Sequence, residues 1–241
     1  MESPDVTSLN IVSPEAWLEA RRALLVEETA HRQERLRLAK KRRALPWTRV
    51  EKAYVFDGPD GPVTLADLFD GRSQLIVYHF MFAPEWEHGC PGCSLQADHI
   101  DGARIHFENG DVSFAAVSRA PIAKLETYRR RMGWGFRWVS SSNTEFSYDY
   151  QAAFRPEAEA ATVTYNFAEQ PHPGVHDLPG TSVFARGEDG AVYHTYSVYG
   201  AGGEGLVGLN HWLDLAPKGH DGKGGESADW FRRRDEYGPQ G

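Results

Sequence analysis

The residues most able to do chemistry are two cysteines that stand two positions apart in the segment Cys90-Pro91-Gly92-Cys93. The segment opens a predicted helix, whose unpaired N–H groups and dipole favour a negative charge. Cys90 would lie at this N-terminus, where the pKa of its thiol falls and the thiolate becomes a nucleophile. Cys93 lies one turn further in and suits the second step, which resolves the mixed disulfide on Cys90. The spacing therefore predicts a redox-active dithiol.

Tyr78 and His79 are candidates for exchanging a proton with Cys93. Both lie in the apolar run before the motif, and strand residues alternate between the two faces of a sheet. Only one of them can therefore face the cysteines. In the alternative interpretation, His79 is a hydrogen-bonded histidine of the core.

Two further side chains stand close to the motif in sequence. His88, if protonated, would lower the pKa of the Cys90 thiol, although it is equally typical of an exposed loop. Trp86 is expected to cover the disulfide and contact the substrate.

A zinc or copper site is the main alternative to a redox pair that needs no cofactor. Cys90 and Cys93 supply two thiolates, whereas structural zinc is bound by four ligands. Since the chain has no further cysteine, histidines would have to complete such a site. The candidates are His79, His88, His99 and His194. A soft copper site would need both thiolates and one histidine.

The elements that must position these residues alternate between strands and helices. The apolar run 75–82 has the composition of a central strand that is covered on both faces. The other expected strands are 50–56, 114–117, 136–139, 181–186 and 191–198, and the expected helices are 64–69, 90–107, 121–132 and 204–213. Residues 143–179 are expected to be irregular. This order predicts an α/β protein with a thioredoxin-like central mixed sheet flanked by helices.

Pro179 precedes a predicted strand and is a candidate substrate-binding residue. Thioredoxin-like folds carry a cis-proline at this point, facing the disulfide. Such a site would need a cis bond before Pro179, which the sequence does not reveal.

A long helix is expected before the sheet. Ser13 and Pro14 form a helix start, and the helix should run to about Ala44. Its second half is basic, which is typical of a solvated face but also suits an acidic partner or a second subunit in a homodimer. The expected organisation is a helical extension (1–45), the thioredoxin-like domain (46–215) and a loop-rich tail packed on it (216–241).

Composition restricts the partners and the compartment. The 241 residues carry a net charge of −8, which argues against general binding of nucleic acid. The chain lacks a run of apolar residues long enough for a membrane helix, and its first residues lack the pattern of a secretory signal. We therefore expect a cytoplasmic protein without membrane contacts.

Several motifs together resemble a known family. They include Tyr54-Val55-Phe56-Asp57-Gly58, Tyr78-His79-Phe80-Met81-Phe82, Gly89-Cys90-Pro91-Gly92-Cys93-Ser94, Val117-Ser118-Arg119-Ala120-Pro121, Tyr193-His194-Thr195-Tyr196-Ser197 and Asp229-Trp230. From about residue 13 to 238 the chain is similar to the thioredoxin-like family catalogued as domain of unknown function 899 (DUF899). Its members are labelled predicted dithiol-disulfide oxidoreductases. The resemblance implies that Cys90 and Cys93 match the paired cysteines of the family.

The chain departs from the family pattern at three places. Gly92 stands where serine is expected between the cysteines. The stretch 200–203 lacks an arginine, and His220 replaces another, so two basic side chains would be missing from the site.

The leading hypothesis is a thiol-disulfide oxidoreductase, with a dithiol reductant and a small-molecule or protein disulfide as its reaction partners. A metal-dependent oxidase is the second hypothesis. Peroxiredoxin-like reduction of peroxide by Cys90, with Arg119 nearby, is the third. A non-enzymatic binding module that uses the basic helix is the fourth.

Overall fold

The apolar run predicted as a central strand forms β4 (Gln74–His79), the middle of an eight-stranded mixed sheet. This computed structural model describes residues 10–155, 162–220 and 231–238. On one side, β4 pairs in parallel with β5 (Val112–Ser118), which pairs in parallel with β6 (Arg137–Ser140). On the other side it pairs antiparallel with β9 (Gly180–Arg186), which pairs with β10 (Val192–Tyr199).

Three short strands complete the two edges of the sheet. β1 (Thr48–Arg49) lies against β10. At the opposite edge, β2 (Val55–Gly58) pairs with β6 and with β3 (Gly61–Thr64). β2 and β3 form a hairpin, in which Gly58 and Gly61 face each other.

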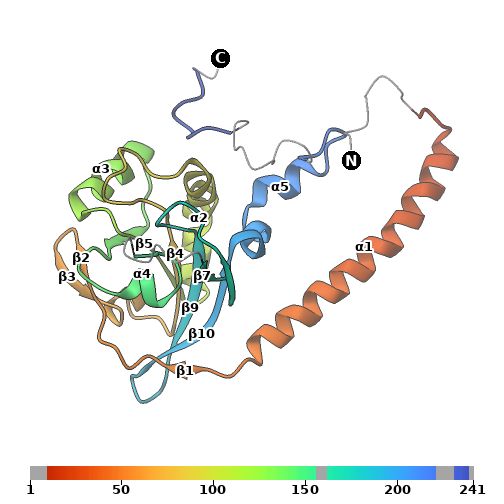
Figure 1. Cartoon of the computed structure of the whole chain (residues 1–241). Helices are drawn as coiled ribbons and strands as arrows, with labels where there is room; N and C mark the ends of the chain where they lie inside the picture. The colour runs from red at the N-terminus through yellow and green to blue at the C-terminus, as the bar shows by residue number, and fades with distance from the viewer. Residues whose placement is uncertain (1–9, 156–161, 221–230, 239–241) are drawn as a thin grey trace.

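Helices cover both faces of this sheet. α2 (Pro91–Asn109) connects β4 to β5, and α3 (Ile122–Met132) connects β5 to β6 (Figure 1). Their core cluster includes Tyr78, Phe80, Cys93, Leu125 and Trp138. The cluster on the other face includes Phe56, Leu75, Val77, Phe146 and Phe184, and receives the short helices η1 (Asp67–Phe69) and α4 (Phe146–Asp149).

The connectivity is that of a thioredoxin-like fold. A parallel β4-α2-β5 unit is followed by the antiparallel pair β9-β10 and a short last helix, α5 (Gly208–Leu213). The predicted fold class is therefore confirmed.

Residues 143–179 are more regular than predicted. They contain α4 and a separate hairpin formed by β7 (Thr162–Tyr165) and β8 (Ala168–Pro171). The two residues at its tip, Asn166 and Phe167, have φ angles of 53° and 64°. Phenylalanine is rare in this conformation. Because the tip lacks the Asn-Gly or Asp-Gly pair that marks such hairpins in a sequence, the hairpin was not predicted.

The predicted helix 204–213 is divided in two. η2 (Gly200–Leu206) begins earlier than expected, and α5 follows after Val207, whose φ and ψ of −92° and 88° are not helical. The glycines in this stretch weaken a continuous helix.

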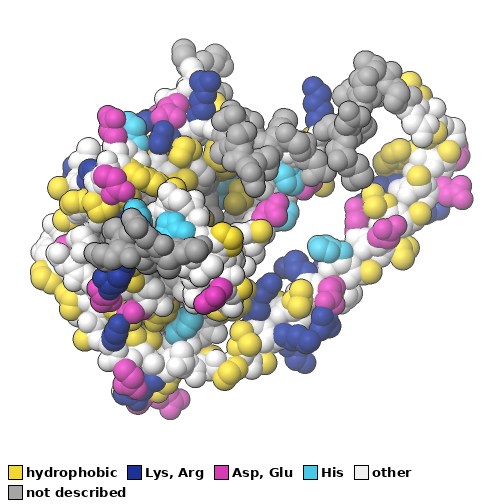
Figure 2. Space-filling view, viewed as in Figure 1, with side chains coloured by type: hydrophobic (Ala, Val, Ile, Leu, Met, Phe, Trp, Pro, Cys, Tyr) yellow, Lys and Arg dark blue, Asp and Glu magenta, His cyan; other side chains and the backbone are white. Residues whose placement is uncertain are grey.

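α1 (Pro14–Arg43) projects away from the sheet and joins it through β1 (Figure 1). It begins as predicted, because the Ser13 side chain accepts a hydrogen bond from the Ala16 N–H. None of its residues is buried. Figure 2 shows hydrophobic side chains along the helix, with Lys and Arg toward the end nearer β1. A homodimer through this helix stays a prediction.

Within the described residues, no helix has the length and apolarity required to cross a membrane. The domain boundaries at residues 45 and 215 stay predictions. Asp229-Trp230, which contributed to the family resemblance, lies outside the described residues.

The core of β4 gives a prediction about stability. Leu75 is 0% exposed, so Leu75→Ala should lower the free energy of unfolding by about 2–5 kcal/mol through lost burial and a cavity. Ile105→Ala, at a position 66% exposed, is the control and should change it by less than about 0.5 kcal/mol. Urea unfolding under reducing conditions measures both. Equal effects of the two variants would contradict the placement of β4 in the core.

Candidate active site

Cys90 caps the N-terminus of α2, and Pro91 occupies the first turn, as the sequence predicts. The Cys90 N–H donates to the Met81 carbonyl at 3.1 Å, which ties the start of the helix to the chain that leaves β4. Cys90 is partly exposed, whereas Cys93 is buried at 2% exposure, and both are free thiols. One sulfur is thus accessible to a substrate and the other is shielded from solvent.

The surroundings of Cys90 lower the pKa of its thiol to about 6. The largest cause is a hydrogen bond from the side chain of Cys93. The N–H groups of Cys93 and Gly92 and the positive charge of Arg233 add to it, while burial acts in the opposite direction. Cys90 is therefore mostly a thiolate at neutral pH.

The pKa of the Cys93 thiol is raised, first by burial and then by its interactions with Cys90. Two donors partly offset this effect, namely the hydroxyl of Tyr78 and the N–H of Met81, which lies 3.5 Å from the Cys93 sulfur. Cys93 thus stays protonated while Cys90 is charged.

Of the two candidates on β4, Tyr78 is the one that faces the cysteines. It shares the core cluster of Cys93 and forms a hydrogen bond with it. His79 lies on the opposite face of the sheet, where its ring stacks on Phe146 at 5.6 Å and its Nε2 lies 2.9 Å from the Ser182 hydroxyl. Burial lowers the pKa of His79 to about 3, so it stays neutral. His79 is thus a hydrogen-bonded histidine of the core and lies away from the dithiol.

The two residues just before the motif take different positions. The His88 side chain is 42% exposed and stacks on Tyr128 with 6.4 Å between ring centroids. The charge of Arg233 favours the Cys90 thiolate. The role of His88 beside Cys90 stays a prediction. Trp86, like Cys90, packs against the core cluster that contains Cys93.

Arg119 lies beyond the end of β5 and its charge is already paired. Its Nε donates to Asp177 at 2.5 Å, and its Nη1 donates to the Tyr148 hydroxyl at 3.4 Å. Asp177 is 4% exposed, so this ion pair is largely shielded from water. The Arg119 guanidinium is thus bound to the Asp177 carboxylate. The peroxidase hypothesis would instead place this guanidinium beside Cys90.

The histidines proposed as metal ligands are not brought together with the thiols. The His99 Nδ1 lies 2.7 Å from the Leu95 carbonyl. His194 lies 2.7 Å from the Ser197 hydroxyl, which is linked through Ser182 to His79 on the far face of the sheet. Among residues 10–155, 162–220 and 231–238, no three His, Cys, Asp or Glu side chains are arranged to hold a metal ion. Within these described ranges, the thiols of Cys90 and Cys93 therefore lack the third donor that the predicted metal site needs.

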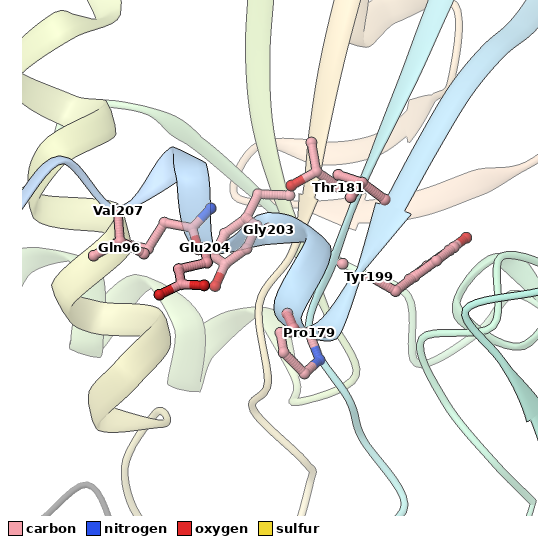
Figure 3. Close-up of a pocket in the computed structure, with 12 residues that line it drawn as sticks. Gln96, Pro179, Thr181, Tyr199, Gly203, Glu204 and Val207 are labelled. Atoms are coloured by element: carbon pink, nitrogen blue, oxygen red, sulfur yellow. The ribbon is translucent and has the colours of Figure 1, made fainter. Parts of the chain in front are cut away.

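A cavity of about 280 Å³ adjoins Tyr78. Figure 3 shows that Gln96 from α2, Glu204 from η2 and Pro179, just before β9, border it. The bond before Pro179 is trans, so the cis-proline of the sequence interpretation is not present here. The Pro179 carbonyl accepts a hydrogen bond from the Tyr165 hydroxyl at 2.6 Å.

The match to a protein family is decisive for identity. Residues 6–237 match the family described as bacterial protein of unknown function, DUF899. The chain belongs to the DUF899 family. The resemblance drawn from the sequence motifs is thereby confirmed. No curated protein matches this DUF899 chain.

Solved structures similar to this DUF899 protein are only distantly related. Peroxidoxin BcpB from Mycobacterium tuberculosis is 14% identical, with a TM-score of 0.46 over 68% of this chain and 94% of that one. A peroxiredoxin Q mutant from Xanthomonas campestris is 11% identical, with a TM-score of 0.47 over 69% and 98%. A secreted M. tuberculosis disulfide oxidoreductase homologous to E. coli DsbE is 13% identical, with a TM-score of 0.37 over 65% and 92%. These values carry no argument about activity.

Arg233 and Tyr165 were missed by the sequence analysis of this DUF899 chain. Arg233 comes from the C-terminal segment, 140 positions beyond Cys93, and no local spacing indicates its approach. Of the two places expected to lack a basic residue, the stretch 200–203 belongs to η2 and contributes Gly200, Ala201 and Gly203 to the cavity beside Tyr78. At the other place, His220 hydrogen-bonds Asp214. A positive charge near Cys90 is thus supplied by a residue that the motifs do not mark.

The lowered pKa of Cys90 gives a testable pH dependence. Alkylation of the reduced protein by iodoacetamide should rise with pH to a plateau, with a midpoint near pH 6, because only the thiolate reacts. Peptide mass spectrometry measures the modification of each cysteine. Cys93 should react far more slowly at every pH up to neutrality. A Cys90 midpoint near the ordinary thiol value of about 8.5 would contradict the site geometry.

Proposed function

We propose that this chain is a thiol-disulfide oxidoreductase in which Cys90 and Cys93 cycle between dithiol and disulfide. The observation that carries the proposal is that the Cys90 and Cys93 thiols differ in exposure and in the direction of their pKa shifts. A partly exposed thiol whose pKa is lowered to about 6 lies next to a buried thiol whose pKa is raised. This division supplies a ready nucleophile and a protected second thiol, as stepwise disulfide exchange requires.

In the first step, the Cys90 thiolate attacks one sulfur of a substrate disulfide. A bond forms between Cys90 and that sulfur, the substrate S–S bond breaks, and the other sulfur leaves as a thiolate. This step consumes the negative charge that raised the pKa of Cys93. Cys93 then becomes easier to deprotonate, and the leaving thiolate is a base that can accept its proton.

In the second step, the Cys93 thiolate attacks Cys90. The Cys90–Cys93 disulfide forms, and the second substrate sulfur leaves as a thiol or thiolate. The protein has lost two electrons and the Cys93 proton, and the substrate disulfide has become one thiol and one thiolate. A dithiol reductant restores the starting state by the reverse exchange. The cycle as written uses no metal or organic cofactor.

Tyr78 is placed to assist the second step. Its hydroxyl forms a hydrogen bond with the Cys93 sulfur, and this bond lowers the pKa of Cys93 against the effect of burial. Burial raises the pKa of Tyr78 well above its ordinary value, so the phenol keeps its proton and acts as a donor. It therefore stabilises the Cys93 thiolate as it forms.

The cavity beside Tyr78 is a candidate place for the rest of the substrate. Its lining includes Gln96 and Glu204, together with Gly200, Ala201 and Gly203 (Figure 3). Such polar groups suit a substrate that carries amide or amino groups, as small peptide disulfides do.

The reaction can be tested with glutathione disulfide as substrate and a dithiol as reductant. Cys90→Ser should abolish turnover, because the attacking sulfur is lost. Cys93→Ser should stop after one attack and accumulate a mixed disulfide on Cys90, which intact mass measures. His88→Gln alters the exposed neighbour and is the control, with turnover within about twofold of wild type. Sustained turnover by Cys90→Ser would refute the proposal, whether the substrate is a disulfide or hydrogen peroxide.

Removing the Tyr78 hydroxyl should slow the second step specifically. In Tyr78→Phe, the Cys93 thiolate loses a donor, so the mixed disulfide should persist several-fold longer in a single turnover. The first step should keep its rate, because Cys90 retains its own hydrogen bonds. Rapid acid quenching followed by mass spectrometry separates the two steps. Equal slowing of both steps would count against this role.

A further inference from the structure

The C-terminal segment 231–238 lies against the residues around the two cysteines. Phe231 lies over the turn between the two cysteines: a Cβ atom placed on Gly92 would be 3.6 Å from Phe231 Cζ and 3.9 Å from the Cys90 sulfur. Gly92 and Cys90 are thus both close to this aromatic ring. A serine at position 92 would fit beneath the ring, since 3.6 Å is an ordinary contact distance.

Arg233, two residues further on, forms hydrogen bonds with the residue that precedes Cys90. Its Nε and Nη2 both donate to the Gly89 carbonyl, at 3.1 and 2.7 Å. Its Nη1 donates to Glu236 at 2.9 Å, and its side chain is only 15% exposed. The guanidinium is thus fixed in place by acceptors on both sides, and its position relative to the Gly89–Cys90 peptide is defined.

The segment is held to both helices that flank the motif. Arg131 on α3 pairs with Asp235 at 2.6 Å and with Glu236 at 3.4 Å. Arg234 lies 3.5 Å from Asp98 on α2. These ion pairs hold the segment to α2 and α3 through side chains other than the cysteines.

We propose that Arg233 completes the active site as a positioning residue, fixing the Gly89 carbonyl and setting a positive charge beside the Gly89–Cys90 peptide. The role deepens the proposed oxidoreductase function and rests on it. Arginine suits this task because it stays charged at every working pH and offers several donors in a fixed plane. Lysine offers a point charge without the two parallel bonds to one carbonyl.

The other titratable groups around Cys90 come from three elements. Cys93 lies on α2, Tyr78 on β4 and Tyr128 on α3, where Tyr128 and Ser94 share a hydrogen bond of 2.9 Å. Tyr78 and Tyr128 keep their protons over the neutral range because burial raises the pKa of each. Arg233 is the arginine whose charge favours the Cys90 thiolate.

The test is the pH profile of Cys90 alkylation in the full-length protein. Arg233→Met should move the midpoint upward, and a shift of one pH unit reduces the alkylation rate at pH 6 about fivefold. Arg232→Met is the control. It removes an equal charge from the residue that precedes Arg233, which is exposed, and should leave the profile unchanged. Arg233→Lys should recover part of the shift, because the charge returns without the bonds to Gly89.

Thermal unfolding of each variant separates chemistry from structure. A profile identical to wild type in Arg233→Met, together with a lower unfolding midpoint, would overturn the proposal and leave Arg233 as a structural clamp only. An equal shift in Arg232→Met would also overturn it, since the effect would then be one of net charge. The alkylation profile requires no turnover, so failure of the oxidoreductase proposal would appear separately as absent disulfide exchange.

Discussion

The interaction between the Cys93 thiol and the Cys90 sulfur is the constraint on which the rest of the site depends. It needs one sulfur at the first turn of α2 and the other buried one turn later, which only a helix starting at Cys90 provides. The start of the helix is in turn fixed by the bond between the Cys90 N–H and the Met81 carbonyl. Because the two thiols share one negative charge, the same contact lowers the pKa of Cys90 and raises that of Cys93.

The central strand β4 divides the polar chemistry of the molecule between its two faces. Tyr78 points to the dithiol, while His79 points to a buried chain of hydroxyl groups that runs through Ser182 and Ser197 to His194. Alternation along a strand enforces this separation, so the histidines of the far face cannot join the thiols without breaking the sheet. The dithiol is therefore surrounded by phenols, backbone N–H groups and one arginine.

Much of this architecture could be predicted from local patterns. The Ser13-Pro14 start of α1, the central strand and the start of α2 at Cys90 each have a short-range physical cause that the sequence displays. The β7-β8 hairpin could not be predicted, because its Asn166-Phe167 tip adopts positive φ angles without glycine. Arg233 could not be predicted either. Its approach to Gly89 depends on ion pairs between distant segments, which no periodicity records.

The most direct test of the account is a redox titration of the whole protein in glutathione buffers of graded potential, followed by acid quenching and intact mass measurement. The account predicts one reversible two-electron transition in which the protein loses two hydrogen atoms, with the new disulfide mapped to Cys90 and Cys93. Persistent glutathione on Cys90 without an internal disulfide would contradict it, because Cys93 would then have no resolving role. The same conclusion would follow if both thiols remained reduced at every potential.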